Sequence, residues 1–249
     1  MTDPLDEYTE KGQSKVSLLL LLPNMLTVAA ICAGMSAIRF GVQGNFTLAV
    51  QLIFAACILV GLDGRLARRL GCDSKMGAEL DSLADFLNFG VAPSLVIYFW
   101  ALQDMSRAGW MSVLVYAVCV VVRLARFNVT SKSDEDNHDS SFFTGVPSPA
   151  AALLVMFPMY LTFGFSDEPI LSDVVICAYM ILIGMLTISR IQTWSFKTTR
   201  VSRENVKYFL VGFAFAGAAF LTYAWVTLAL ICVGYVAIVL WVLVTKRPV

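Results

Sequence analysis

Long apolar runs, broken by short clusters of charged residues, constrain the fold of this 249-residue chain more than any other feature. Hydrophobic residues make up 58% of the sequence and charged residues only 14%, whereas a soluble domain carries about a quarter charged residues. A helix of about 20 apolar residues is long enough to cross the hydrocarbon core of a bilayer. The sequence therefore predicts an all-α fold, a polytopic bundle of transmembrane helices.

About eight segments are long and apolar enough to be spans. They are residues 16–38, 45–63, 79–101, 108–127, 146–165, 169–189, 205–223 and 225–245. The organisation that follows is a polar tail at 1–15, a membrane domain of six spans at 16–200, and two additional C-terminal helices at 201–249.

Lysine and arginine are distributed asymmetrically across these predicted spans. If the N-terminus is inside, the tail and the inner loops carry 16 of the 18 basic residues, and only Arg39 and Arg107 fall outside. Because basic residues accumulate in cytoplasmic loops, this split predicts that both termini are cytoplasmic. The net charge of zero gives no indication of nucleic-acid binding.

Three aspartates lie where the predicted second and third spans meet the inner membrane surface. Asp63 ends one span, and Asp81 and Asp85 open the next, four residues apart and therefore on one helix face. A carboxylate at membrane depth costs at least about 2.5 kcal/mol unless it is compensated, so such residues are candidates for function. Carboxylate oxygens are hard ligands that suit Mg2+ or Mn2+. A purely structural alternative is an ion-paired cluster, in which these acids pair with nearby arginines such as Arg68 and Arg123.

The stretch from residue 63 to residue 85 reads D-G-R-L-A-R-R-L-G-C-D-S-K-M-G-A-E-L-D-S-L-A-D. It resembles the signature of the CDP-alcohol phosphatidyltransferases, D-x2-D-G-x2-A-R-x8-G-x3-D-x3-D. Seven positions match: Asp63, Gly64, Ala67, Arg68, Gly77, Asp81 and Asp85. The first aspartate of the signature is replaced by Val60.

Segments outside the signature are similar to bacterial, membrane-embedded phosphatidylserine synthases. They include P-N-M-L-T at 23–27, R-L-A-R-F-N at 123–128 and F-T-G-V-P-S-P-A at 143–150. The resemblance implies transfer of a phosphatidyl group from CDP-diacylglycerol to L-serine with release of CMP. It also implies a multi-pass protein of the bacterial inner membrane with a cytoplasmic active site, and a homodimer.

The resemblance implies a role for each matching residue. Asp63, Asp81 and Asp85 would bind Mg2+ or Mn2+, and Asp85 would also take the proton of the serine hydroxyl. The residues expected to bind substrate are Gly64, Ala67, Arg68, Gly77, Arg123 and Arg126.

The two arginines beyond the signature have a competing interpretation. We expect Arg123 and Arg126 to bind a carboxylate or phosphate, although anchoring at the membrane interface would place arginine there equally well. Asn128 and Ser148 are weaker candidates for polar contacts with the substrate.

Val60 leaves alternatives open, because valine cannot bind a metal. Glu79 is a poor substitute, since it lies about 200° around the helix from Asp81. The chain is then either an active phosphatidylserine synthase, a family member with another acceptor alcohol, or a catalytically impaired protein that binds CDP-lipids. A transporter is disfavoured, because its polar residues would be expected near the bilayer midplane.

Overall fold

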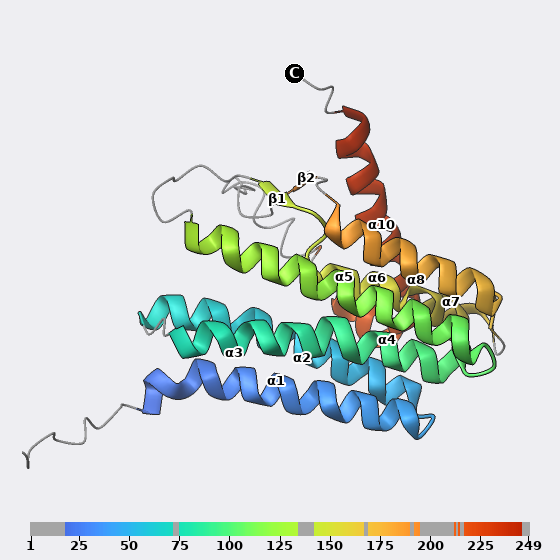
Figure 1. The fold of residues 1–249 in the computed structure, drawn as a ribbon. Helices are drawn as coiled ribbons and strands as arrows, with labels where there is room; N and C mark the ends of the chain where they lie inside the picture. The colour runs from blue at the N-terminus through green and yellow to red at the C-terminus, as the bar shows by residue number, and fades with distance from the viewer. Residues whose placement is uncertain are drawn as a thin grey trace, which may run out of the picture.

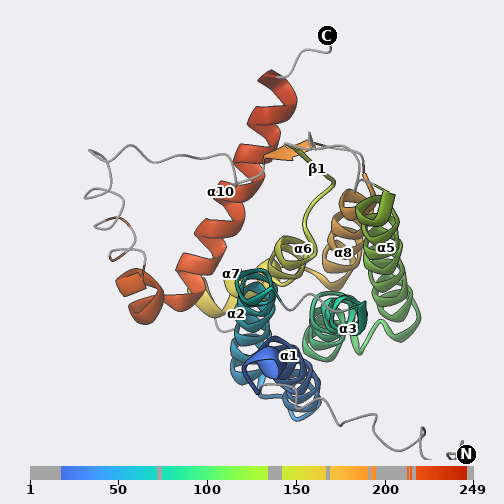
Figure 2. The same cartoon turned by 90° about the vertical axis from the view of Figure 1, so that its left-hand side faces the viewer.

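The protein is described by a computed structural model that covers residues 18–71, 75–133, 142–166, 169–189, 192–194, 212, 214 and 217–245. Most of these residues form long helices that lie side by side (Figure 1). Viewed along the bundle, α1, α2 and α3 gather on one side, and α5, α6 and α8 on the other (Figure 2). The prediction of a helical bundle with several apolar spans is confirmed.

Helices α1 (Leu18–Val42) and α2 (Phe46–Leu70) form a tightly packed hairpin. The chain reverses through Gly44, whose φ of 77° favours glycine. Asn45 then caps α2, because its side-chain oxygen accepts a hydrogen bond from the Leu48 N–H at 3.2 Å. At its other end α2 stops at Gly71, which has a left-handed φ of 62° and donates its N–H to the Ala67 carbonyl.

The third long helix is irregular in a way that the sequence pattern did not predict. It consists of α3 (Lys75–Asp85), the π-helical segment η2 (Phe86–Val91), α4 (Ala92–Ile97) and a second π-helical segment, η3 (Tyr98–Leu102). Segment η2 approaches α1 very closely, since a Cβ atom at Gly34 would lie 2.0 Å from the Asn88 side-chain oxygen. π-Helical turns inside α-helices are frequent at functional sites, and η2 begins directly after Asp85.

The remaining helices complete the interior. They are α5 (Ser106–Ser133), α6 (Ser148–Val155), α7 (Phe157–Phe165), α8 (Asp173–Ile188) and α10 (Ala224–Thr245). Helices α6 and α7 meet at a bend of 42°, next to Pro158, a residue that interrupts helical hydrogen bonding. The fully buried side chains include Tyr116 on α5, Tyr160 on α7 and Met180 on α8.

A short two-stranded antiparallel sheet is absent from the sequence prediction; its first strand lies between α5 and α6, and its second follows α8. Strands β1 (Phe142–Thr144) and β2 (Gln192–Trp194) pair in the register Phe142–Trp194, Phe143–Thr193 and Thr144–Gln192. Gly145 follows β1 with a φ of 88°, and a Cβ atom there would lie 2.7 Å from the Thr187 carbonyl oxygen. Only glycine fits this position without displacing the end of α8.

Within the described ranges, five helices are long and apolar enough to cross a membrane, or six if α6 and α7 form one bent span. Helix α8 coincides with a further predicted span but has only 16 residues. Helix α10 is apolar but crosses the other helices at a steep angle (Figures 1 and 2). The predicted tail at 1–15 and most of the predicted span 205–223 lie outside the described residues.

Candidate functional site

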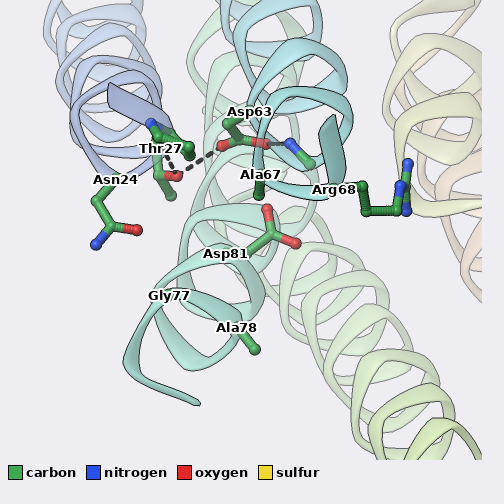
Figure 3. A pocket seen from close by; sticks show the side chains of 10 residues that line it. Asn24, Thr27, Asp63, Ala67, Arg68, Gly77, Ala78 and Asp81 are labelled. Atoms are coloured by element: carbon green, nitrogen blue, oxygen red, sulfur yellow. Dashed lines mark hydrogen bonds between the residues drawn. The ribbon is translucent and has the colours of Figure 1, made fainter. Parts of the chain in front are cut away.

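A pocket of about 240 Å3 lies where the ends of α1, α2 and α3 meet. It is lined by Pro23, Asn24, Thr27, Asp63, Gly64, Ala67, Arg68, Gly77, Ala78 and Asp81. Six of the seven signature residues, all except Asp85, therefore share one pocket (Figure 3). The two helices that carry the signature, α2 and α3, are therefore neighbours at this pocket.

Asp63 is fixed in place by two hydrogen bonds. The Thr27 hydroxyl donates to one carboxylate oxygen at 2.6 Å, and the backbone N–H of Gly64 donates to the other. Both Asp63 and Thr27 are only 3% exposed, so water cannot readily replace either bond. Hydrogen bonds to ionised groups are stronger than neutral ones, and they hold the carboxylate in one orientation at the pocket wall.

Thr27 is a site residue to which sequence reasoning gave no role. Its segment, P-N-M-L-T, contributed to the resemblance. Its contact with Asp63 could not be predicted, because Asp63 lies 36 positions later in the chain, in another helix. Asn24, one helical turn earlier, also lines the pocket. The signal available in the sequence was a proline, an asparagine and a threonine within the otherwise apolar first half of the helix.

Asp81 and Asp85 project from successive turns of α3. The Asp81 carboxylate points from α3 toward Asp63 and Ala67 of α2 (Figure 3). Asp85 lies one turn deeper and interacts electrostatically with both Asp81 and Asp63. Within the described part of the chain, one buried carboxylate oxygen of Asp81 and one of Asp85 have no hydrogen-bond partner. Unsatisfied buried acceptors are expensive, which makes a purely structural role for these aspartates a poor explanation.

The unpartnered carboxylate oxygens of Asp81 and Asp85 are candidate ligands for a metal ion. Among the described residues, no three His, Cys, Asp or Glu side chains are grouped closely enough to hold one ion together. The donors themselves fit Mg2+ or Mn2+, because they are hard carboxylate oxygens, mutually repelling and partly without partners. Asp63, Asp81 and Asp85 could therefore each contribute a ligand to such a cation, but its remaining ligands would have to be oxygens of the substrate or of water.

Small residues leave the α2 side of the pocket open. A Cβ atom at Gly64 would meet nothing within 4 Å, so packing within the described protein does not require glycine there. Ala67, one turn away, lines the same pocket. Arg68 is exposed and extends away from the aspartates in Figure 3, and it interacts electrostatically with Asp81.

Arg123 and Arg126 lie outside the lining of this pocket. Arg123 is buried on α5, donates a hydrogen bond to the Ser148 hydroxyl and interacts electrostatically with Asp85. Arg126 donates to the Ile188 carbonyl oxygen at 2.9 Å. Arg123 is thus connected to the acidic site through Asp85, whereas the described contact of Arg126 ties α5 to the end of α8.

The weaker candidates also occupy defined positions. The Asn128 side-chain amide donates to the Ser82 hydroxyl at 2.9 Å, which joins α5 to α3 next to Asp81.

Val60 is half-buried on α2, three residues before Asp63, and Glu79 is exposed on α3. Neither Val60 nor Glu79 is among the residues that line the pocket, which agrees with the helix-geometry argument against Glu79 as a substitute ligand.

Comparison with known proteins gives a consistent result. The family model described as CDP-alcohol phosphatidyltransferase matches residues 20–188. A CDP-diacylglycerol–serine O-phosphatidyltransferase of Mycobacterium leprae is 42% identical over 202 residues, covering 81% of this chain and 67% of the relative. The proteins of the same name from Mycobacterium bovis and Helicobacter pylori are 47% identical over 150 residues and 35% identical over 202 residues.

Coverage differs among these relatives. The matched region spans 60% of this chain and 52% of the M. bovis protein, but 81% of this chain and 82% of the H. pylori protein. The chain thus spans between about half and two thirds of the length of the mycobacterial relatives it matches.

Proposed function

The chain belongs to the CDP-alcohol phosphatidyltransferase family, and from this premise we propose that it transfers the phosphatidyl group of CDP-diacylglycerol to L-serine and releases CMP. The observation that carries the proposal is the pocket in which Asp63 of α2 faces Asp81 of α3. Relatives from three bacteria that bear the serine transferase name support serine as the acceptor.

We propose that Asp63, Asp81 and Asp85 hold Mg2+ or Mn2+. When bound, such an ion would neutralise charge on the pyrophosphate and on the departing CMP. The protein contributes orientation, because Thr27 and the Gly64 N–H fix the Asp63 carboxylate. The open space at Gly64, next to Ala67 and across the pocket from Gly77, would admit the nucleotide close to the helix backbones. Arg68, at the rim, supplies a positive charge for the diphosphate.

Asp85 is suited to act on the acceptor. In the proposed reaction the serine hydroxyl oxygen forms a bond to the phosphorus that carries diacylglycerol, and the bond from that phosphorus to the CMP oxygen breaks. Asp85 accepts the hydroxyl proton as the oxygen attacks. Its orphan carboxylate oxygen supports this role, because one acceptor site remains available within the described protein.

Arg123 is the better of the two candidates for the acceptor carboxylate. It is buried and interacts electrostatically with Asp85, so a serine molecule between them would place its hydroxyl near the base and its carboxylate near the guanidinium. Arg126 would add positive charge on the same face of α5, one turn further along.

The finer topology is also a proposal. The split of basic residues, 16 against 2, supports eight spans with both termini in the cytoplasm of a bacterial cell and the site at the cytoplasmic face of the inner membrane. In this arrangement residues 16–200 form the transferase domain, and residues 201–249 add two helices. A homodimer, expected from the resemblance, is tested by the mass of the purified protein in detergent.

The decisive experiment is CMP release by purified protein supplied with CDP-diacylglycerol, Mn2+ or Mg2+ and a panel of acceptor alcohols. Release that depends on L-serine supports the proposal. Release with glycerol phosphate, inositol phosphate or choline instead would assign another acceptor. Binding of CDP-diacylglycerol without turnover would favour the alternative raised by Val60, a lipid-binding relative that has lost activity.

A further inference from the structure

A second group of buried polar side chains lies outside the lining of the pocket and centres on Arg123. This side chain is 9% exposed, and one terminal nitrogen donates to the Ser148 hydroxyl at the start of α6. Its Nε atom is buried and has no hydrogen-bond partner among the described residues. One N–H of a charged group is therefore left without an acceptor, a situation that proteins rarely tolerate without a functional reason.

A second buried group without a partner among the described residues lies on helix α10. The Tyr235 hydroxyl is buried, lacks a partner within the described part of the chain, and interacts electrostatically with Arg123. One turn before Tyr235, the Cys232 thiol lies 3.5 Å from the Leu153 carbonyl oxygen of α6. This contact holds α10 against the helix that begins with Ser148, the hydrogen-bond partner of Arg123.

The two orphan groups have matching chemistry. The Nε–H of arginine can only donate, and a tyrosine hydroxyl can donate to an anion. Two donors, one on a cation, suit a carboxylate, whose two oxygens accept hydrogen bonds in one plane. An apolar ligand would leave both donors unsatisfied, which is unfavourable for buried groups.

The position relative to Asp85 limits the ligand further. Arg123 interacts electrostatically with both Asp85, the proposed base, and Tyr235. In L-serine only two carbon atoms separate the hydroxyl oxygen from the carboxyl carbon. A small amino acid can therefore reach both groups.

We propose that the Tyr235 hydroxyl, together with Nε of Arg123, binds the carboxylate of the acceptor, so that α10 forms part of the acceptor site. This inference rests on the proposed function, because it takes serine as the acceptor. It assigns a role to a helix that lies beyond residues 20–188, the region matched by the family model. Tyr235 is a specificity residue in this account, since it recognises the group that distinguishes serine from simple amino alcohols.

The test is the full-length variant Tyr235→Phe, which removes one oxygen atom and keeps the ring. We expect KM for L-serine to rise at least about tenfold, because one hydrogen bond to a charged group is lost, and KM for CDP-diacylglycerol to stay within twofold. Tyr160→Phe is the matched control, because the Tyr160 hydroxyl on α7 is also buried and unpartnered among the described residues. Within the described part of the chain, no arginine interacts electrostatically with it. An unchanged KM for serine in Tyr235→Phe, or an equal rise in both variants, would overturn the inference.

A second readout separates this inference from the proposed function. Ethanolamine is serine without its carboxylate, so the preference of Tyr235→Phe for serine over ethanolamine, as the ratio of kcat/KM values, should fall about tenfold. If the wild-type protein releases no CMP with serine, the proposed function fails, and the thermal shift produced by L-serine in the presence of CDP decides the inference. A shift present in wild type and lost in Tyr235→Phe supports the acceptor site, and no shift in wild type overturns it.

Discussion

Replacing Thr27 with valine tests how the first helix prepares the acidic site. Valine has nearly the same shape as threonine but lacks the hydroxyl that donates to Asp63 at 2.6 Å. Because Asp63 is only 3% exposed, its oxygen would lose its partner without gaining water. A hydrogen bond to an ionised group contributes about 1.5–3 kcal/mol. We expect the free energy of unfolding in detergent to fall by about this amount if the whole interaction is lost.

The effect on activity follows from the orientation of the carboxylate. Removing a group that orients a metal-binding side chain typically costs about 10- to 100-fold in metal affinity or activity. We therefore expect Thr27→Val to lower kcat/KM for CMP release about 10- to 100-fold, with a higher Mn2+ concentration needed for half-maximal rate. The rate should be measured as a function of Mn2+ at saturating CDP-diacylglycerol and serine.

The chain offers two matched controls for this variant. Thr27→Ser keeps the hydroxyl and should retain most of the activity. Thr162→Val removes an equally buried hydroxyl that contacts the carbonyl oxygen four residues earlier at 3.1 Å, the same distance as the Thr27 contact with Pro23. Among the described residues, the Thr162 hydroxyl has no carboxylate partner. Full activity in Thr27→Val, or an equal loss in Thr162→Val, would refute the claim that Thr27 acts through Asp63.

Three further predictions concern the same helices. Asp85→Asn keeps the shape of the side chain, but the amide cannot accept the hydroxyl proton. We therefore expect the rate of CMP release to fall at least about 100-fold while CDP-diacylglycerol still binds. Retained activity would exclude Asp85 as the base. Val60→Asp adds a carboxylate three residues before Asp63, and we expect faster CMP release at limiting Mn2+; an unchanged rate would mean that three carboxylates suffice. Gly34→Ala should lower the melting temperature measured in detergent, because the new Cβ would lie 2.0 Å from the Asn88 side-chain oxygen. The control Gly61→Ala should leave the melting temperature unchanged, because its Cβ would meet nothing within 4 Å. Equal melting temperatures for the two variants would contradict the close approach of α1 and η2.

The acidic site was predictable from sequence because its residues are close in the chain. Asp63, Gly64 and Ala67 lie near the end of α2 and Asp81 lies in the next helix along the chain, α3. Helical periodicity alone places Asp81 and Asp85 on one face. The replacement of the first signature aspartate by Val60 was likewise visible in the sequence. What periodicity could not supply was the neighbour of Asp63, since Thr27 belongs to a helix 36 residues earlier and only tertiary packing brings it there.

The departures from the predicted fold have similar causes. Hydropathy counts apolar residues but does not register a change of hydrogen-bonding pattern, so the π-helical segments η2 and η3 were missed. The strands β1 and β2 have three residues each and pair across 48 positions or more, which leaves no local signal. Tyr235 could not be connected to Arg123 in advance, because its helix is uniformly apolar and shows no amphipathic face that would orient it.

The central claim is that this chain joins a phosphatidyl group to serine at the pocket formed by α1, α2 and α3. The most direct measurement is CMP release by the purified protein with CDP-diacylglycerol, Mn2+ and either L-serine or no acceptor, beside the variant Asp81→Asn. The account predicts CMP release that requires both serine and Mn2+ and is lost in the variant. Release that is independent of serine, or that survives Asp81→Asn unchanged, would contradict it.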